Sequence, residues 1–245
     1  MNRILVCDDD KDIVEAISIY LETAGYEVVK AYDGFEALNI LTKEDEADLK
    51  LDERIHLVII DIMMPNMDGI MATRKIRQFS QVPVIFLTAK SEDADKILGL
   101  DIGADDYVTK PFNPLELVAR AKSQIRRYTQ LGSITGNENP GVDEDRLIVN
   151  GGLVINDSAK SVTVDGEEVK LTPIEYNILL YLTENRGRVF NTAQIYEAVW
   201  DEDAIASDNI IAVHIRHIRE KIEINPKEPR YLKVVWGQGY KVEKL

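Results

Sequence analysis

The chain has 245 residues, of which 45% are hydrophobic, and this apolar content is sufficient for two folded domains. Its formal net charge of −14 excludes a protein that attracts nucleic acid over its whole surface. The single Cys7 excludes an intrachain disulfide, and neither a signal peptide nor an apolar stretch of about 18 residues is present, so we expect a cytoplasmic protein.

The first half of the chain alternates strand patterns with helix patterns. Apolar runs predict strands over residues 3–7, 26–31, 57–61, 82–88 and 106–111. Between and after them, helices are predicted around residues 13–21, from 35 onwards and over 115–127. The alternation predicts an α/β domain, residues 1–127, with a doubly wound, flavodoxin-like parallel sheet of five strands in the order 2-1-3-4-5.

The second half has a different pattern. Residues 128–150 show no periodicity and are rich in Gly, Asn and acidic residues, so we predict a flexible acidic linker. In residues 151–245, three short β-like runs precede Thr172, a predicted N-cap that Pro173 follows at the first helical position. Further helices near 192–200 and over 207–223, followed by a hairpin over 231–242, predict an α+β domain.

Polar side chains stand at the ends of the predicted parallel strands. Asp8 and Asp9 follow the first strand, Asp61 ends the third, Thr88 ends the fourth and Lys110 ends the fifth. Strands one and three are neighbours in the predicted order, so the three carboxylates should meet in one crevice. They would repel one another there, and a hard divalent cation with oxygen ligands, Mg²⁺, would offset that repulsion.

This group of residues fits one kind of chemistry. A carboxylate nucleophile, a metal, a lysine and a hydroxyl together form a site for phosphoryl transfer to a carboxylate. Each residue alone has a simpler interpretation: acidic residues stabilise a helix N-terminus, Asp61 fits a turn, and Lys110 fits a solvated surface. Their joint occurrence at successive strand ends favours the functional interpretation.

These motifs resemble the receiver domain of two-component response regulators. The matching residues are Asp8-Asp9, Asp61 within 59–69, Thr88-Ala89 and 107–112. The resemblance implies that Asp61 accepts a phosphoryl group from a sensor histidine kinase. It also implies that Asp9, Asp61 and the Met63 carbonyl bind Mg²⁺, and that Asp8 supports the ion through a water molecule. Lys110 would contact the phosphoryl group, and the Lys110-Pro111 bond after it would be cis. Thr88 and Tyr107 would form a switch pair that moves on phosphorylation. The segment 45–53 is longer than that family leads us to expect.

The C-terminal stretch carries the basic residues that the rest of the chain lacks. Residues 207–245 hold eight basic and five acidic side chains. In the predicted helix 207–223, an apolar face is interleaved with His214, Arg216, His217 and Arg219, followed by Lys221. Such residues are often only solvated, but a basic helix followed by a Gly-containing hairpin can bind duplex DNA.

The stretches 172–179, 213–222 and 235–242 resemble the winged-helix output domain of OmpR/PhoB regulators. The resemblance makes 207–223 the recognition helix and 231–242 the wing, and it places the loop 201–207 against RNA polymerase. It implies DNA contacts by these residues: Asn209, His214, Arg216, His217, Arg219, Lys221, Trp236, Tyr240 and Lys241. Relatives often have Arg where Trp236 stands; packing within the wing is the simpler interpretation of that tryptophan. The stretches 114–120 and 235–241 are also similar to VanR-type regulators.

The same family resemblance implies a symmetric receiver dimer that forms on phosphorylation. The charged residues at its interface would be Lys96, Asp101, Asp105, Asp106, Glu116, Arg120 and Arg127. The expected pairs are Lys96 with Glu116, and Asp105 or Asp106 with Arg120 or Arg127. A dimer would bind directly repeated DNA sites more tightly than a monomer.

The sequence leaves three functional hypotheses. The main one is a transcription regulator, not an enzyme, whose DNA binding is controlled by phosphorylation of Asp61 and which slowly dephosphorylates itself. The second is a stand-alone phosphatase or phosphotransferase, which would leave the C-terminal domain without a role. The third is a DNA-binding protein with a degenerate receiver, and the intact set of Asp8, Asp9, Asp61, Thr88 and Lys110 argues against it.

Overall fold

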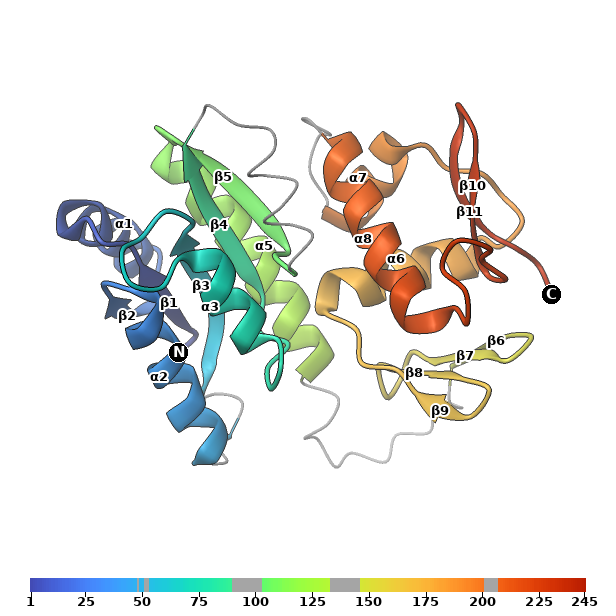
Figure 1. Ribbon diagram of the computed structural model, residues 1–245, viewed down its shortest axis with the longest axis horizontal. Coiled ribbons are helices and arrows are strands. Elements are labelled where there is room, and N and C mark those ends of the chain that lie inside the picture. The colour runs from blue at the N-terminus through green and yellow to red at the C-terminus, as the bar shows by residue number, and fades with distance from the viewer. Residues whose placement is uncertain (48, 51–52, 90–102, 133–145, 201–206) are drawn as a thin grey trace. The chain divides into compact units, whose positions relative to one another are not determined.

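A computed structural model describes residues 1–47, 49–50, 53–89, 103–132, 146–200 and 207–245. The chain forms two compact units, Met1–Thr129 and Gln130–Leu245 (Figure 1). No helix in the described part of the chain has both the length and the apolar character needed to cross a lipid bilayer.

The N-terminal unit is built on a five-stranded parallel sheet. Its strands are β1 (Arg3–Cys7), β2 (Glu27–Ala31), β3 (Ile55–Asp61), β4 (Val84–Ala89) and β5 (Asp106–Lys110). They pair in the order β2-β1-β3-β4-β5, which confirms the predicted fold class and strand order. The described helices of this unit are α1 (Lys11–Thr23), α2 (Gly34–Glu46), α3 (Gly69–Ile76) and α5 (Pro114–Gly132).

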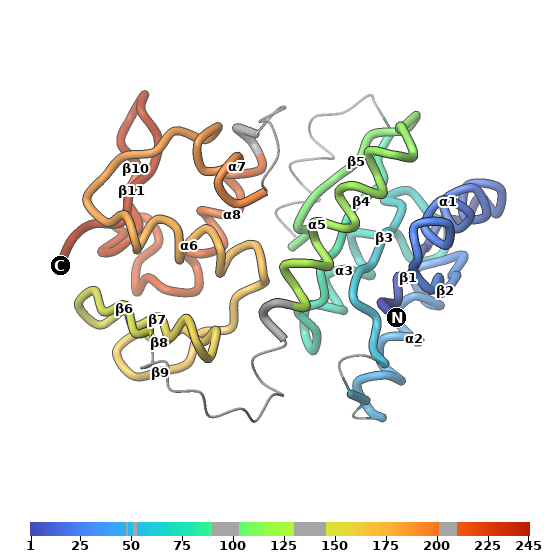
Figure 2. Tube along the Cα trace, turned by 180° about the vertical axis from the view of Figure 1, so that it is seen from behind, coloured from blue at the N-terminus to red at the C-terminus, as the bar shows by residue number. Residues whose placement is uncertain are grey.

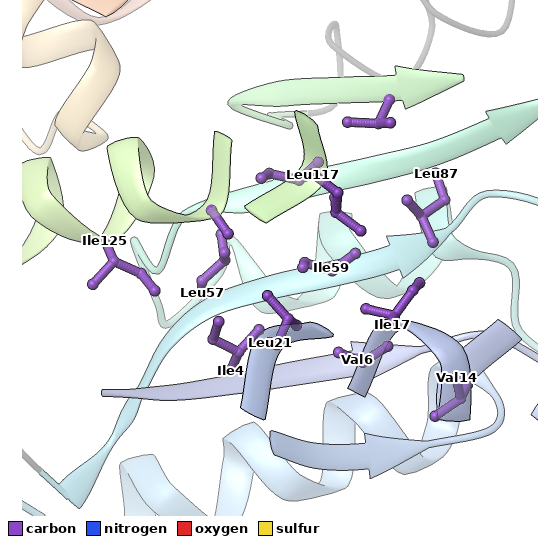
Figure 3. Packing of buried hydrophobic residues seen from close by; sticks show 13 residues of the cluster. Ile4, Val6, Val14, Ile17, Leu21, Leu57, Ile59, Leu87, Leu117 and Ile125 are labelled. Carbon is purple, nitrogen blue, oxygen red and sulfur yellow. The ribbon is translucent and has the colours of Figure 1, made fainter. Parts of the chain in front are cut away.

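Both faces of this sheet are covered by helices. On one face, Ile4, Val6, Leu57 and Ile59 pack against side chains of α1 and α5, among them Leu117 (Figure 3). Helices α2 and α3 lie on the other face (Figure 1). Every residue of β3 is buried, as expected for a central strand of a doubly covered parallel sheet. This burial fixes β3, and therefore the position of the residue that ends it, Asp61.

Three of these helices begin at an aspartate. Asp10, Asp33 and Asp68 each accept hydrogen bonds from backbone N–H groups of the first turn, of α1, α2 and α3 respectively. Asp68 is followed directly by Gly69, the first residue of α3. Helix α2 ends at Glu46, so the long segment 45–53 lies largely beyond it; residues 48, 51 and 52 are outside the described residues.

The described part of the C-terminal unit combines antiparallel strands with three helices, whose course Figure 2 traces. Strands β6 (Leu147–Asn150), β7 (Leu153–Asn156), β8 (Ser161–Val164) and β9 (Glu167–Glu168) form one antiparallel sheet. Helices α6 (Pro173–Glu184), α7 (Thr192–Trp200) and α8 (Ser207–Ile222) follow, and β10 (Leu232–Val235) with β11 (Gly239–Val242) forms the terminal hairpin. The architecture confirms the predicted winged-helix class.

The predicted linker 128–150 was too long at both ends. Helix α5 continues to Gly132, and residues 147–150 form β6. The short strand was missed because its alternating Leu147 and Val149 side chains are more than half exposed, so it carries no run of core residues. Residues 133–145 lie outside the described part of the chain.

Candidate functional site

The strand register determines which polar residues meet at the edge of the parallel sheet. Cys7 of β1 is paired with Ile60 of β3, so the next residues, Asp8 and Asp61, lie side by side. On the far side of β3, Asp61 is paired with Leu87, so Thr88 lies one residue beyond. Strand β4 in turn pairs Ala89 with Lys110. The carboxyl ends of four neighbouring strands therefore bring these side chains to one place.

The carboxylates of Asp8, Asp9 and Asp61 form a compact acidic group. One oxygen of each lies within 4.8 Å of the others. Asp8 and Asp61 are buried, at 1% and 5% exposure, while Asp9 is exposed and leaves an open side. Three carboxylate oxygens at this spacing are the donor set that Mg²⁺ prefers, so the residues fit the predicted ion.

Lys110 connects the two buried carboxylates. Its Nζ donates to Asp8 Oδ2 at 2.6 Å and lies 2.8 Å from Asp61 Oδ1. Burial alone would lower the pKa of Lys110, but the hydrogen bonds to Asp61 and Asp8 outweigh it and raise the pKa, so the ammonium is charged. The Lys110-Pro111 peptide bond is cis, as expected.

Asp61 has an environment that is both apolar and charged. Burial raises its pKa above the ordinary value, although Lys110 and the Met63 N–H, which donates to Asp61 Oδ2 at 2.9 Å, act in the opposite direction. The Met63 side chain is exposed. Its backbone N–H is the group placed at Asp61, and a role for its carbonyl oxygen as a metal ligand stays a prediction.

Two glycines hold the loop that follows Asp61. A Cβ on Gly69 would lie 2.1 Å from the Asp61 carbonyl oxygen, and the Gly69 N–H donates to the Ile62 carbonyl. On the other side, Gly34 donates to the Met67 carbonyl, and a Cβ there would lie 2.6 Å from that oxygen. Sequence reasoning missed these positioning contacts, and the only signal for them was a glycine at the first residue of each helix.

Cys7 lies behind the acidic group and is not part of it. Its Sγ contacts Met64 Sδ at 3.6 Å and the Asp33 carbonyl at 3.3 Å, and the side chain is fully buried. Burial, with the nearby carboxylates, raises the pKa of the thiol far above its usual range. Cys7 is therefore an inert structural thiol.

Thr88 and Tyr107 lie on the neighbouring strands β4 and β5; Thr88 is paired with Thr109, and Tyr107 with Phe86, two residues further from the acidic group. Thr88 is buried, and its hydroxyl donates to the Ala89 carbonyl at 3.2 Å. Tyr107 is half-buried on β5, and its backbone N–H donates to Asp106. Their movement as a switch pair stays a prediction.

The charged residues predicted for a dimer interface are largely engaged within the N-terminal unit. Asp106 pairs with Arg120 at 2.9 Å, and Asp105 pairs with Arg77 at 2.8 Å; both aspartates are 1% exposed. Arg120 also binds Glu116, one turn away on α5. Arg127 was expected to pair across a dimer, but it is buried in this unit and donates to Ser123. Lys96 and Asp101 lie outside the described residues.

On the predicted recognition helix α8, the two histidines do not face outwards. His214 is 2% exposed, with its ring 5.8 Å from that of Trp200, and His217 is 7% exposed, 3.9 Å from Glu175. The expectation that both face DNA is wrong for this structure because they lie on the same side of the helix as its apolar residues. Trp200 is in the core.

The remaining basic residues differ in how much they reach solvent. Arg216 is exposed and pairs with Glu220, whereas the half-buried Arg219 donates to the Leu232 carbonyl at 2.7 Å. Burial lowers the pKa of the Arg219 guanidinium. Lys221 binds the buried Glu175 at 2.6 Å, which anchors α8 to α6. The side chain of Asn209 and the loop 201–206 lie outside the described part.

The described hairpin contributes three of the predicted DNA residues. Trp236 is 87% exposed at the tip, so the interpretation that it packs within the wing is wrong. Tyr240 and Lys241 are half-buried on β11, where Lys241 pairs with Glu243.

Two family models match the chain: the response regulator receiver domain over residues 4–122 and the C-terminal domain of transcriptional regulatory proteins over residues 166–242. The regulatory protein VanRc of Enterococcus gallinarum is 42% identical over 242 residues, and VanR of Enterococcus faecium is 42% identical over 245 residues; both alignments cover 99% of each chain. A solved RitR mutant matches with a TM-score of 0.72 over 100% of both chains, and at 21% identity it supports the fold alone.

Proposed function

The chain belongs to the two-component response regulators of the OmpR/PhoB type, and from that membership we propose that phosphorylation of Asp61 controls its binding to promoter DNA. A sensor histidine kinase is the proposed phosphoryl donor. The observation that carries the proposal is the ammonium of Lys110, which lies between the carboxylates of Asp8 and Asp61.

The residues define how the transfer would proceed. An ionised Asp61 oxygen forms a bond to phosphorus as the phosphorus–nitrogen bond of the donor histidine breaks, and the bonding electrons leave with the nitrogen. Lys110, whose ammonium lies 2.8 Å from Asp61 Oδ1, would move from that carboxylate to the phosphoryl oxygens, where the negative charge develops. Mg²⁺ held by Asp8, Asp9 and Asp61 would supply further positive charge at those oxygens.

The buried Thr88 is the residue that we propose moves first when Asp61 is phosphorylated. Its hydroxyl now donates to the Ala89 carbonyl at 3.2 Å, a long hydrogen bond. The hydroxyl would exchange this bond for a stronger one to a charged phosphoryl oxygen. Tyr107, across the strand pair β4–β5, would turn inwards behind it.

Phosphorylation would favour a receiver dimer by a population shift. A shift of about 100-fold needs roughly 2.7 kcal/mol of differential stability. Because Asp106 and Arg120 already pair within one chain, the dimer would depend on the exposed Glu116 with Lys96 and on apolar contact. Each exposed pair contributes only about 0–1 kcal/mol.

The C-terminal unit would bind directly repeated promoter sites and, through residues 201–207, RNA polymerase. Its exposed Arg216 and its wing are the surface for DNA. This activity requires a cytoplasmic location. A stand-alone phosphatase or phosphotransferase would give the C-terminal unit no role, and the matched families are not enzyme families; slow loss of phosphate from Asp61 would reset the switch.

The experiment is treatment of the full chain with acetyl phosphate and Mg²⁺, followed by intact-mass measurement and light scattering. The proposal predicts one added phosphoryl group, mapped to Asp61, and a dimer; Asp61→Ala should remain unmodified and keep its original size. Modification at another residue, or an unchanged assembly state after full modification, would contradict it.

A further inference from the structure

A cavity of about 220 Å³ opens in the C-terminal unit where the chain leaves α8 and returns as β10. Residues from the stretch 222–231 form one wall, and Val164 and Asp165, at the turn between β8 and β9, form the other. A single water molecule needs only about 10–15 Å³ of such space, whereas drug-sized ligands occupy roughly 300–1,000 Å³. The cavity therefore suits a small organic molecule.

Tyr231 brings a buried hydroxyl to this cavity without a hydrogen-bond partner. The side chain is 2% exposed, and its hydroxyl meets no partner within the described part of the chain. By contrast, the buried Tyr176 of α6 donates its hydroxyl to Asp157 at 2.9 Å. It is costly to leave a buried hydroxyl unpaired, so the Tyr231 hydroxyl indicates that a bound molecule supplies its partner.

Two opposite charges flank this hydroxyl. A Cβ on Gly152 would collide with Asp165 Oδ1 and lie 3.0 Å from the Tyr231 hydroxyl, so both groups stand over the same glycine. The Arg230 guanidinium lies 5.1 Å from the centroid of the Tyr231 ring, and one of its nitrogens would lie 3.4 Å from a Cβ on Gly151. Among the described residues, neither Asp165 nor Arg230 forms an ion pair. The carboxylate and the guanidinium therefore share a cavity without neutralising each other.

The wall that carries Arg230 and Tyr231 is fixed by a buried carboxylate. Glu223, the residue after α8, is 8% exposed and accepts the backbone N–H groups of residues 230, 231 and 232 at 2.7–2.9 Å. The carboxylate of Glu223 is therefore already satisfied within the chain, and its hydrogen bonds hold this loop to the end of α8. Because the loop is pre-organised, a ligand would not have to order it on binding.

We propose that this cavity binds a free α-amino acid, whose carboxylate contacts the Arg230 guanidinium and the Tyr231 hydroxyl and whose ammonium contacts Asp165. A molecule of this class carries both charged groups on one carbon atom, so it matches a cavity that offers a cation, a hydroxyl and an anion. A simple anion would leave Asp165 without a partner, and a simple cation would leave Arg230 without one. Val164 and the buried Ile222 give the wall apolar surface for the side chain of the amino acid. The site is separate from the acidic group of the N-terminal unit, and the inference does not depend on the proposed function.

The test combines thermal unfolding with titration calorimetry of the full chain, to which the common α-amino acids are added one at a time. At least one should bind with one molecule per chain and raise the unfolding temperature of the C-terminal unit, because a ligand that binds only the folded state stabilises it. The amine and the carboxylic acid that each lack one of its charges should bind at least about 10-fold more weakly. A dipeptide of the same residue holds the two charges further apart and should also bind more weakly, which distinguishes a free amino acid from the end of a peptide.

Three variants assign the binding to the cavity. Tyr231→Phe removes only the hydroxyl and should weaken binding by roughly 10-fold, whereas the ligand-free variant should be at least as stable as the wild type because it lacks the unpaired group. Arg230→Gln and Asp165→Asn each remove one charge and should weaken binding by roughly 10-fold or more. Lys227→Gln is the control, because it removes an exposed charge from the same loop outside the cavity wall, and it should bind like the wild type.

Binding of none of the amino acids would overturn the proposal, as would equal binding by Tyr231→Phe. Equally tight binding of the amine or of the carboxylic acid would refute a zwitterionic ligand in favour of a single ion. If the ligand-free Tyr231→Phe variant were less stable than the wild type, the hydroxyl would have a partner within the folded chain, and the observation that carries the proposal would fail. None of these measurements involves phosphorylation or DNA, so the test of the proposed function stays separate.

Discussion

The ammonium of Lys110 lies 2.8 Å from Asp61 Oδ1 and 2.6 Å from Asp8 Oδ2, so one cation bridges two buried carboxylates from neighbouring strands and offsets half of their charge. Two such carboxylates repel each other when they stand alone. We propose that the same cation contacts the phosphoryl oxygens that would arrive at Asp61. Lys110 would therefore both stabilise the unphosphorylated site and take part in the transfer to Asp61.

Replacement of Lys110 by Ala should slow phosphorylation of Asp61 by about 100-fold, the usual cost of removing one charged donor from a reacting oxyanion. The rate is measured from the intact mass during treatment with acetyl phosphate and Mg²⁺. Lys122→Ala, an exposed lysine on α5, is the matched control and should react at the wild-type rate. Equal rates for both variants would show that Lys110 has no part in the transfer.

Replacement of Gly69 by Ala should destabilise the N-terminal unit by about 3 kcal/mol, because the new Cβ would lie 2.1 Å from the Asp61 carbonyl oxygen and backbone must move. Gly25→Ala is the control: Gly25 has a φ of 90° but open space around it, so its cost should be about 1–2 kcal/mol. Urea unfolding measures both. If the two variants were equally stable, the predicted backbone clash at Gly69 would be disproved.

Replacement of Arg216 by Ala should weaken binding to every duplex and reduce the salt slope by about 1, since we expect its exposed guanidinium, now paired with Glu220, to contact a phosphate. Lys244→Ala removes the same charge from an exposed site near the C-terminus and should leave both quantities unchanged. A loss of affinity for only one sequence would assign Arg216 to a base instead.

Asp157 should make the C-terminal unit sensitive to acid. Burial acts to raise its pKa, but hydrogen bonds from Lys160 and Tyr176 outweigh burial and lower it. The resulting stabilisation is present above about pH 4, the unfolded pKa, and is lost as the pH falls through the lower folded value. Asp157→Asn should therefore cost about 1 kcal/mol at pH 7 and much less near pH 2, as measured by urea unfolding. The exposed Glu167→Gln is the control, and a pH-independent difference for Asp157→Asn would contradict the assignment.

The fold and the acidic site were predictable because the position of each strand end follows from the apolar residues next to it in the sequence. A buried apolar run fixes each strand, and the residue after it must lie at the edge of the sheet, so Asp8, Asp61 and Lys110 could be placed together from the sequence alone. The need for glycine at position 69 could not be predicted, because the close approach of the Asp61 backbone appears only once the strand and the helix are folded together.

The faces of α8 were less predictable for a physical reason. Histidine fits both a basic surface and a core, and only the position of Trp200 and Glu175 shows that His214 and His217 point inwards. Lys221 was assigned to DNA, but its ammonium meets a carboxylate on α6. Basic residues spaced three or four apart indicate one face of a helix. Their spacing does not show whether neighbouring helices cover that face of α8.

The central claim is that a phosphoryl group on Asp61 sets the affinity for DNA. Its most direct measurement compares the affinity of the full chain for selected duplexes before and after modification with acetyl phosphate and Mg²⁺, with Asp61→Ala treated identically. The account predicts an increase of at least about 10-fold for the wild type and none for Asp61→Ala, with the same sequence preference in both. An unchanged affinity of the fully phosphorylated wild type, or an equal increase for Asp61→Ala, would contradict it.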